Sequence, residues 1–348
     1  MTDEDVKSIN LALQGGGAHG AFTWGVLDRL LEDGRVRFDG ISATSAGAMN
    51  AVVCAYGQMR GGRDGAREAL LGFWRRISDA AGLASPLRLT PLEHLLGIPP
   101  ERSLAFAAFE SMTRTFSPYQ FNPFGLNPLR DVLASCVDFD ELRRCDCARL
   151  FISATNVRSG NVRVFQNQEV SMAAVLASAC LPMLFQAVEI DGSHYWDRGY
   201  MGNPSLFPLI YSTDSRDIVV VHINPVFVDD LPRSAMEISD RVNEITFNAA
   251  LLKEFRAIAF VTKLLEEGWI KDEYRPRLRH MLMHSIRADD ALNCLGAASK
   301  FDCSWEFLTD LRDRGRAVAE QWLGENFIHL GKRATVDLRA EFLETEER

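Results

Sequence analysis

The sequence lacks a long apolar run, an excess of basic residues and a cysteine framework. No stretch reaches the ~18 to 20 apolar residues that a membrane-spanning helix needs. The 348 residues include 38 Lys and Arg against 47 Asp and Glu, which gives a formal net charge of -9. Nucleic-acid-binding domains usually carry a basic face, so the composition argues against a nucleic-acid partner. The same acidity disfavours electrostatic capture by anionic membranes, but it leaves hydrophobic contact with lipid open.

The seven cysteines form an odd set without the spacing of a disulfide framework. Cys145 and Cys147 are too close for a C-x-x-C motif or a zinc knuckle. His280 and His284 lie on an alternating, strand-like segment, which separates them by about 13 Å at the usual rise per residue. We therefore expect no metal site and no cofactor. The cysteine pattern favours a reducing compartment, and without a secretory leader pattern in the first residues it predicts a cytoplasmic protein.

The order of apolar patterns predicts an α/β fold. Residues 8–14 alternate like a strand, residues 21–33 like a helix, residues 38–44 like a second strand and residues 46–56 like a small-residue helix. Such a β-α-β-α start is typical of a parallel sheet with crossover helices. We expect a three-layer α/β/α architecture with a mainly parallel central sheet.

Later segments define the predicted domains. Buried-strand patterns recur at 149–156 and 217–223, and long amphipathic helices are expected at 234–267 and from residue 304 onward. We predict a catalytic domain over residues 8–225 and a mostly helical C-terminal extension over 230–348, packed on it.

Residues 83–128 interrupt the α/β pattern with seven prolines and several aromatic residues. Two interpretations remain open. The segment is either an insertion that packs on the core, or a lid that supplies an apolar wall to a site. Phe121 and Phe124 are the candidate wall residues.

A glycine-rich loop joins the first strand to the first helix with the sequence Gly15-Gly16-Gly17-Ala18-His19-Gly20. It satisfies the dinucleotide fingerprint G-x-G-x-x-G, and Asp39 stands near the place of a ribose-binding acid. However, its exposed backbone N–H groups and the helix N-terminus after it suit any anion, including an oxyanion.

The second strand ends in Ala43-Thr44-Ser45-Ala46-Gly47, at a strand-to-helix junction. This segment resembles the G-x-S-x-G nucleophile elbow, with Ala43 in place of the first glycine. The alternative is that Ser45 only caps the helix.

A nucleophilic serine needs a base, and Asp197 is the candidate because it follows a short strand and precedes a turn. The alternatives for Asp197 are a turn cap or a partner for Arg198. His194 and His222 also stand near strand ends, but we interpret them as structural.

Together these segments resemble the patatin-like phospholipases. The family's blocks are a G-G-G-x-[R/K]-G loop, G-x-S-x-G and D-G-[G/A], and a fourth block is matched by Ala177-Ser178-Ala179-Cys180-Leu181-Pro182 with Phe185. The resemblance implies a dyad of Ser45 and Asp197 without a catalytic histidine. It also implies an oxyanion hole from the backbone of Gly15, Gly16, Gly17 and Ala18, an acyl-enzyme intermediate and acyl-ester substrates of the phospholipid or lysophospholipid class. Peripheral contact of the cytoplasmic protein with a membrane or lipid surface stays open.

Three departures from the family pattern bear on activity: His19 replaces a basic residue, Ala43 replaces a glycine, and Arg198 follows the catalytic aspartate. His19 is placed with Phe121 and Phe124 beside the expected substrate pocket. Two alternatives to a phospholipase stay open, namely an acyltransferase or other esterase using the same site, and a weakly active binding or regulatory protein. The sequence does not indicate an oligomeric state.

Overall fold

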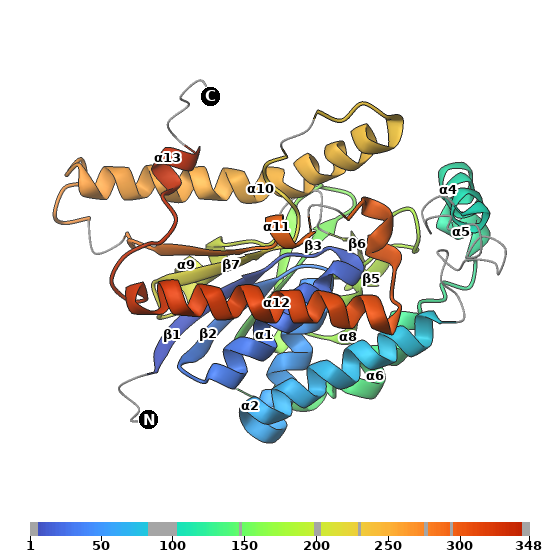
Figure 1. The fold of residues 1–348 in the computed structure, drawn as a ribbon, viewed down its shortest axis with the longest axis horizontal. Helices are drawn as coiled ribbons and strands as arrows, with labels where there is room; N and C mark the ends of the chain where they lie inside the picture. Colours follow the sequence, from blue (N-terminus) through green and yellow to red (C-terminus); the bar gives the residue numbers. More distant parts are fainter. Residues whose placement is uncertain are drawn as a thin grey trace.

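A mainly parallel sheet forms the centre of the molecule (Figure 1). The computed structural model describes residues 6–82, 103–145, 148–197, 203–228, 231–274, 278–292 and 295–342. The strands in these ranges are β1 (Lys7–Leu13), β2 (Val36–Ala43), β3 (Arg149–Asn156), β4 (Val162–Gln166), β5 (Val188–Ile190), β6 (Ser193–Trp196), β7 (Asp217–His222) and β8 (Leu282–Arg287).

The strand order is β5-β6-β3-β2-β1-β7-β8, and β4 pairs with β3 beside this path. The five strands from β3 to β8 in this order are parallel to one another. By contrast, β4 and β6 are antiparallel to β3, and β5 is antiparallel to β6. All six residues of β7 are buried, as expected for a parallel strand covered on both faces.

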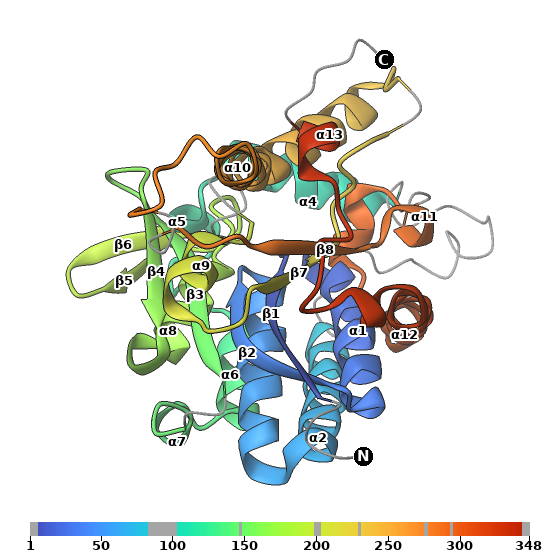
Figure 2. The same cartoon turned by 90° about the vertical axis from the view of Figure 1, so that its left-hand side faces the viewer.

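Helices cover both faces of the sheet, as Figure 2 shows for α10 above it and α1 below. One face carries α1 (Gly20–Asp33), α2 (Ala46–Ala81), α6 (Pro128–Cys136), α8 (Met172–Ser178) and α12 (Trp305–Asn326). The other carries α9 (Phe207–Ser212), α10 (Ala235–Glu266) and α13 (Leu338–Phe342). The expected three-layer α/β/α fold is thereby confirmed.

Shorter elements lie around these layers. They are η2 (Gly17–His19), α4 (Leu104–Thr115), α5 (Pro118–Phe121), α7 (Phe139–Leu142), η4 (Asn167–Glu169), α11 (Asp289–Leu292), η7 (Ala297–Phe301) and η8 (Phe327–His329). In Figure 1, α4 and α5 lie to the right of the sheet, on the side of β5 and β6. Residues 83–102 of the predicted insertion fall outside the described residues.

Two helices differ from the sequence expectation. The helix expected over 46–56 extends further, and α2 ends only at Ala81. The chain bends at Gly61 and Gly62, and the helix resumes after them. Gly62 has a φ of 63°, which glycine adopts at little cost. The amphipathic helix expected over 234–267 buries apolar residues such as Leu251 and Phe255 only in its second half, because Ile238, Val242 and Ile245 of its first half are exposed.

The C-terminal region is mostly helical, as expected, and it also completes the sheet. Its strand β8 pairs in parallel with β7. Its helix α12 packs on α1 so closely that a Cβ on Gly25 or Gly315 would collide with the backbone of the other helix. His284 of β8 is buried between Asp217 (2.9 Å) and Thr335 (2.9 Å), which fixes the following chain to the sheet.

Five of the seven cysteines lie within the residues that the structure describes. Cys54, Cys136, Cys180 and Cys303 are free thiols, and Cys145 is disulfide-bonded. Among the described helices, none combines the length and the apolar character needed to cross a membrane.

The close crossing of α1 and α12 leads to a stability prediction. Gly315→Ala should lower the free energy of unfolding by about 1 to 3 kcal/mol, because its methyl group meets the Phe22 carbonyl oxygen. Gly324→Ala lies on the same helix in open space and should be neutral or gain up to about 1 kcal/mol from helix propensity. Urea unfolding followed by circular dichroism measures both, and equal effects would contradict the close packing.

Candidate active site

Ser45 occupies a strained turn between β2 and α2. Its backbone has φ 56° and ψ -125°, a left-handed φ that side chains other than glycine rarely adopt. Although Ser45 is the N-cap residue of α2, its side chain makes no capping hydrogen bond. The strain therefore does not serve to cap the helix, and it leaves the half-buried hydroxyl at the carboxyl end of β2.

The glycine-rich loop lies directly against this turn. A Cβ on Gly15 would overlap the Ser45 Cβ and would lie 3.3 Å from its Oγ. A Cβ on Gly47 would lie 2.5 Å from the Leu13 carbonyl oxygen. Glycine at these positions is what lets the loop and the serine turn meet. The structure thus brings together two of the predicted segments.

Asp197 is brought to the same region by residues at the end of α8. The Ser45 N–H donates to Ser178 Oγ (2.9 Å), and Ser178 Oγ donates to the Ser153 carbonyl (2.7 Å). Two residues further on, the Cys180 carbonyl accepts from the Asp197 N–H (2.8 Å). Asp197 is buried. The pKa of the Cys180 thiol is raised to about 12, first by the burial of the thiol and then by the charge of Asp197. Arg198 lies outside the described residues.

A buried amide network holds the glycine-rich loop. The Gly15 N–H donates to Asn203 Oδ1 (2.6 Å), so this N–H is engaged within the protein. The Gly15 carbonyl accepts from Asn224 Nδ2 (2.9 Å) and Asn203 Nδ2 (3.2 Å). Gln14 bridges both asparagines, since its Nε2 donates to the Asn203 carbonyl (3.2 Å) and its Oε1 accepts from the Asn224 N–H (3.0 Å). The loop is therefore fixed on its inner side.

The sequence patterns do not predict this network or the anchoring role of Ser178. A signal existed for two of its members, because Gln14 and Asn224 follow the buried strands β1 and β7 closely. Polar residues at the carboxyl ends of parallel strands are typical of sites in open α/β sheets.

His19 turns away from solvent toward the C-terminal region. Its Nε2 lies 2.7 Å from Ser299 Oγ, which itself donates to the Gly296 carbonyl (2.6 Å). The His19 ring must then donate through Nε2, which is the neutral tautomer with Nδ1 unprotonated. Burial, and next the charge of Lys300, lower the pKa of His19 to about 3. A neutral His19 supplies no positive charge to the loop.

Of the two candidate pocket aromatics, Phe121 is half-buried, whereas Phe124 is 86% exposed. The segment that carries them is tied to the chain before β5, because Gln186 Nε2 donates to the Asn122 carbonyl (2.8 Å). On the other side, Phe109 of α4 contacts Phe301 of η7 edge to face at 5.7 Å. The insertion thus reaches η7, which covers the glycine-rich loop.

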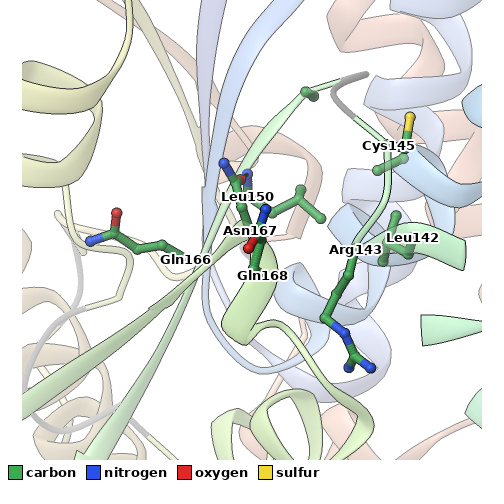
Figure 3. Close-up of a pocket in the computed structure, with 9 residues that line it drawn as sticks. Leu142, Arg143, Cys145, Leu150, Gln166, Asn167 and Gln168 are labelled. Carbon is green, nitrogen blue, oxygen red and sulfur yellow. Dashed lines mark hydrogen bonds between the residues drawn. The ribbon is translucent and has the colours of Figure 1, made fainter. Parts of the chain in front are cut away.

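A separate pocket of about 220 Å³ lies at the opposite end of β3, near its first residues (Figure 3). Figure 3 shows Leu150 with Asn167 and Gln168 on one side and Leu142, Arg143 and Cys145 on the other. It contains none of the predicted site residues. The described residues also contain no cluster of His, Cys, Asp and Glu that could hold a metal ion.

These features define an α/β protein whose polar site lies at the carboxyl ends of a parallel sheet. Within that class, the chain belongs to the patatin-like phospholipase family, whose family model matches residues 11–210. Membership makes lipid acyl hydrolysis the class of activity to consider. No curated protein matches the chain. A search of solved structures finds VipD from Legionella pneumophila, with 16% sequence identity and a TM-score of 0.43 over 92% of this chain and 67% of that one, a likeness too low to bear on function.

The buried histidines lead to a prediction about pH. Burial is also the main cause that lowers the pKa of His222 to about 3, and neither of its ring nitrogens has a hydrogen-bond partner among the described residues. Between pH 6.5 and 3 the unfolded chain binds the proton that the folded chain excludes, so stability falls as the pH falls. His222→Leu should reduce this slope by up to about 1.4 kcal/mol per pH unit.

Urea unfolding at several pH values from 8 to 4 measures the slope. At pH 8 both proteins carry a neutral residue at this position, so any difference there reports packing alone. Parallel stability curves for wild type and variant would show that His222 does not resist protonation.

Proposed function

We propose that the protein is a serine lipid acyl hydrolase that uses Ser45 as nucleophile and Asp197 as its base. The observation that carries this proposal is the strained backbone of Ser45 at a strand-to-helix turn, packed directly against Gly15 of the glycine-rich loop. A left-handed serine that does not cap its helix is stabilised only by its surroundings, and such strain gathers at functional sites. Family membership supports acyl lipids as the substrate class.

In the proposed reaction, Asp197 accepts the Ser45 hydroxyl proton as Oγ bonds to the carbonyl carbon of an acyl ester. The resulting oxyanion is bound by backbone N–H groups of Gly16, Gly17 and Ala18, since the Gly15 N–H is engaged by Asn203. Collapse of this intermediate expels the alcohol, which takes the proton from Asp197 and leaves an acyl-enzyme. Water, deprotonated by Asp197, then attacks the acyl group, and Ser45 regains its proton as the fatty acid leaves.

The insertion carries exposed apolar side chains and contacts η7, which lies against the glycine-rich loop. Exposed apolar side chains gather on α4, α5 and the segments next to them: Leu104, Phe116, Tyr119, Phe124, Leu126 and Met183. A surface of this kind marks a site of contact with another apolar phase. We assign it to contact with the lipid surface, where Phe124 enters the interface and half-buried Phe121 lies nearer the acyl chain.

The first prediction from this mechanism concerns covalent labelling. A fluorophosphonate should modify Ser45, with loss of fluoride from phosphorus, and Ser45→Ala should abolish both labelling and esterase activity. Asp197→Asn should lower activity by at least about 10²-fold, the low end of general-base catalysis. Mass spectrometry of the labelled protein and hydrolysis of a chromogenic ester measure these effects.

The matched controls for the base are His194→Ala and His222→Ala, which should cost far less than Asp197→Asn. A loss from either histidine as large as that from Asp197, in a folded protein, would indicate a triad in place of the dyad. Labelling that persists in Ser45→Ala would remove Ser45 as the nucleophile.

A second prediction tests the lipid-contacting surface. Phe124→Ser should lower hydrolysis of an ester held in phospholipid vesicles by roughly tenfold, since burial of a Phe side chain contributes about 1.5 to 3 kcal/mol. Hydrolysis of a short, water-soluble ester should stay unchanged. Tyr211→Ser is the control, because Tyr211 is 80% exposed but lies on α9. Equal losses on vesicles and on the soluble ester would point to a structural role for Phe124.

A further inference from the structure

Lys300 lies outside the family-matched residues, yet it contacts the glycine-rich loop. It belongs to η7, and its carbonyl oxygen would lie 2.5 Å from a Cβ on Gly17. Its side chain passes to the inner side of the loop, where Nζ donates to Asn224 Oδ1 (2.8 Å) and stands 5.6 Å from the centre of the Phe247 ring. One residue thus touches both sides of the loop.

The contacts of Lys300 continue as a chain of hydrogen bonds to Gly15. Lys300 holds the oxygen of the Asn224 amide, which turns the other end of that amide, Nδ2, toward the Gly15 carbonyl at 2.9 Å. The orientation of Asn224 is further fixed by its own N–H, which donates to Gln14 Oε1 (3.0 Å). With the oxygen engaged by a lysine, the amide can present only its N–H₂ group to Gly15.

The next group in this chain is the Gly16 N–H. The Gly15 carbonyl and the Gly16 N–H belong to one planar trans peptide, so they point in opposite directions. With the carbonyl held inward by Asn224 and Asn203, the Gly16 N–H is directed outward from the network. Among the residues that the structure describes, it has no hydrogen-bond acceptor. Hydrogen bonds on the carbonyl also polarise the peptide and strengthen its N–H as a donor.

Two acidic residues partly offset the effect of burial on the charge of Lys300. Burial lowers its pKa, while the charges of Glu244 and then Asp240 oppose this effect. In either protonation state the amine can donate to Asn224, and the charged form donates more strongly. His19, the loop residue that stands where the family has a cation, is neutral and bonded to the neighbouring Ser299.

We propose that Lys300 is a positioning residue that orients and polarises the Gly16 N–H as an oxyanion donor, acting through Asn224 and the Gly15–Gly16 peptide. The inference deepens the proposed function and rests on it for its catalytic meaning. It assigns the cation that supports the oxyanion loop to the C-terminal region and not to the loop itself.

The test combines Lys300→Met, Asn224→Leu and the double variant with a control, Lys263→Met. Lys263 is also a half-buried lysine near an aromatic ring, with Nζ 5.7 Å from the centre of the Trp269 ring, but it lies near the end of α10. Each variant is made in the full chain and checked for folding. If Lys300→Met does not fold, Lys300→Gln takes its place. Because Gln keeps a donor and removes only the charge, its effects on kcat and on the Gly16 resonance should have the same direction and a smaller size.

In the kinetic arm, Lys300→Met should lower kcat on a soluble ester by about tenfold with little change in KM, less than the 10² to 10³-fold loss for a deleted oxyanion donor. Affinity for an alkyl trifluoromethyl ketone, which adds Ser45 Oγ to form an oxyanion, should fall by the same factor. The double variant should lose no more than Asn224→Leu alone, because both changes interrupt one chain of hydrogen bonds. Fully multiplicative losses would overturn the proposal.

The second arm needs no catalysis. In protein labelled with ¹⁵N-glycine, the Gly16 amide proton should shift upfield in Lys300→Met and stay in place in Lys263→Met. Gly16→Ala identifies the resonance, since a Cβ there meets its nearest neighbour at an ordinary 3.5 Å. An unmoved resonance in Lys300→Met overturns the proposal whatever the activity. A shifted resonance in a protein that neither labels nor hydrolyses esters would overturn the proposed function and leave the coupling of Lys300 to Gly16 standing.

Discussion

The site depends on the absence of a side chain at residue 15. Gly15 is the first glycine of the loop that follows β1, and any Cβ at this residue would overlap Ser45. The close approach of these two backbones places the glycine-rich loop against the Ser45 turn. Gly15 is buried, so its N–H and carbonyl groups must form hydrogen bonds with other groups of the protein. Asn203 and Asn224 do so from two further segments of the chain.

Much of this arrangement could be predicted from the sequence because it is local. A strand, a glycine-rich turn and a helix adjoin one another, as do a strand, the Ser45 turn and a second helix, and each junction has its own composition. The parallel sheet then follows from the order of elements, since consecutive β-α units bring the carboxyl ends of their strands to one edge. The family resemblance rested on the same local blocks and was confirmed.

What the sequence left open depends on contacts between distant residues. Ser178 supports Ser45 from 133 positions away, and Lys300 reaches Asn224 across 76. No periodicity marks such residues, because one hydrogen bond fixes a single side chain and leaves no pattern along the chain. The exposed half of α10 is the opposite case, because there a pattern in the sequence suggests a buried face that the structure does not have. Ile238 and Val242 have the spacing of a buried face, but burial is decided by what packs there, and spacing alone does not contain that information.

The sheet and the site of this chain depend on residues that lie beyond the region matched by the family model. The matched region ends at residue 210, before β7 begins, yet β7 pairs with β1 and is buried along its whole length. Without it, β1 would present an open edge at the centre of the sheet. Asn224, just beyond β7, would also be lost, and with it one of the two donors to the Gly15 carbonyl. The residues beyond 210 are therefore part of the structure that holds the glycine-rich loop, first through β7 and Asn224 and then, in the C-terminal region, through η7, whose residues contact both Gly17 and His19.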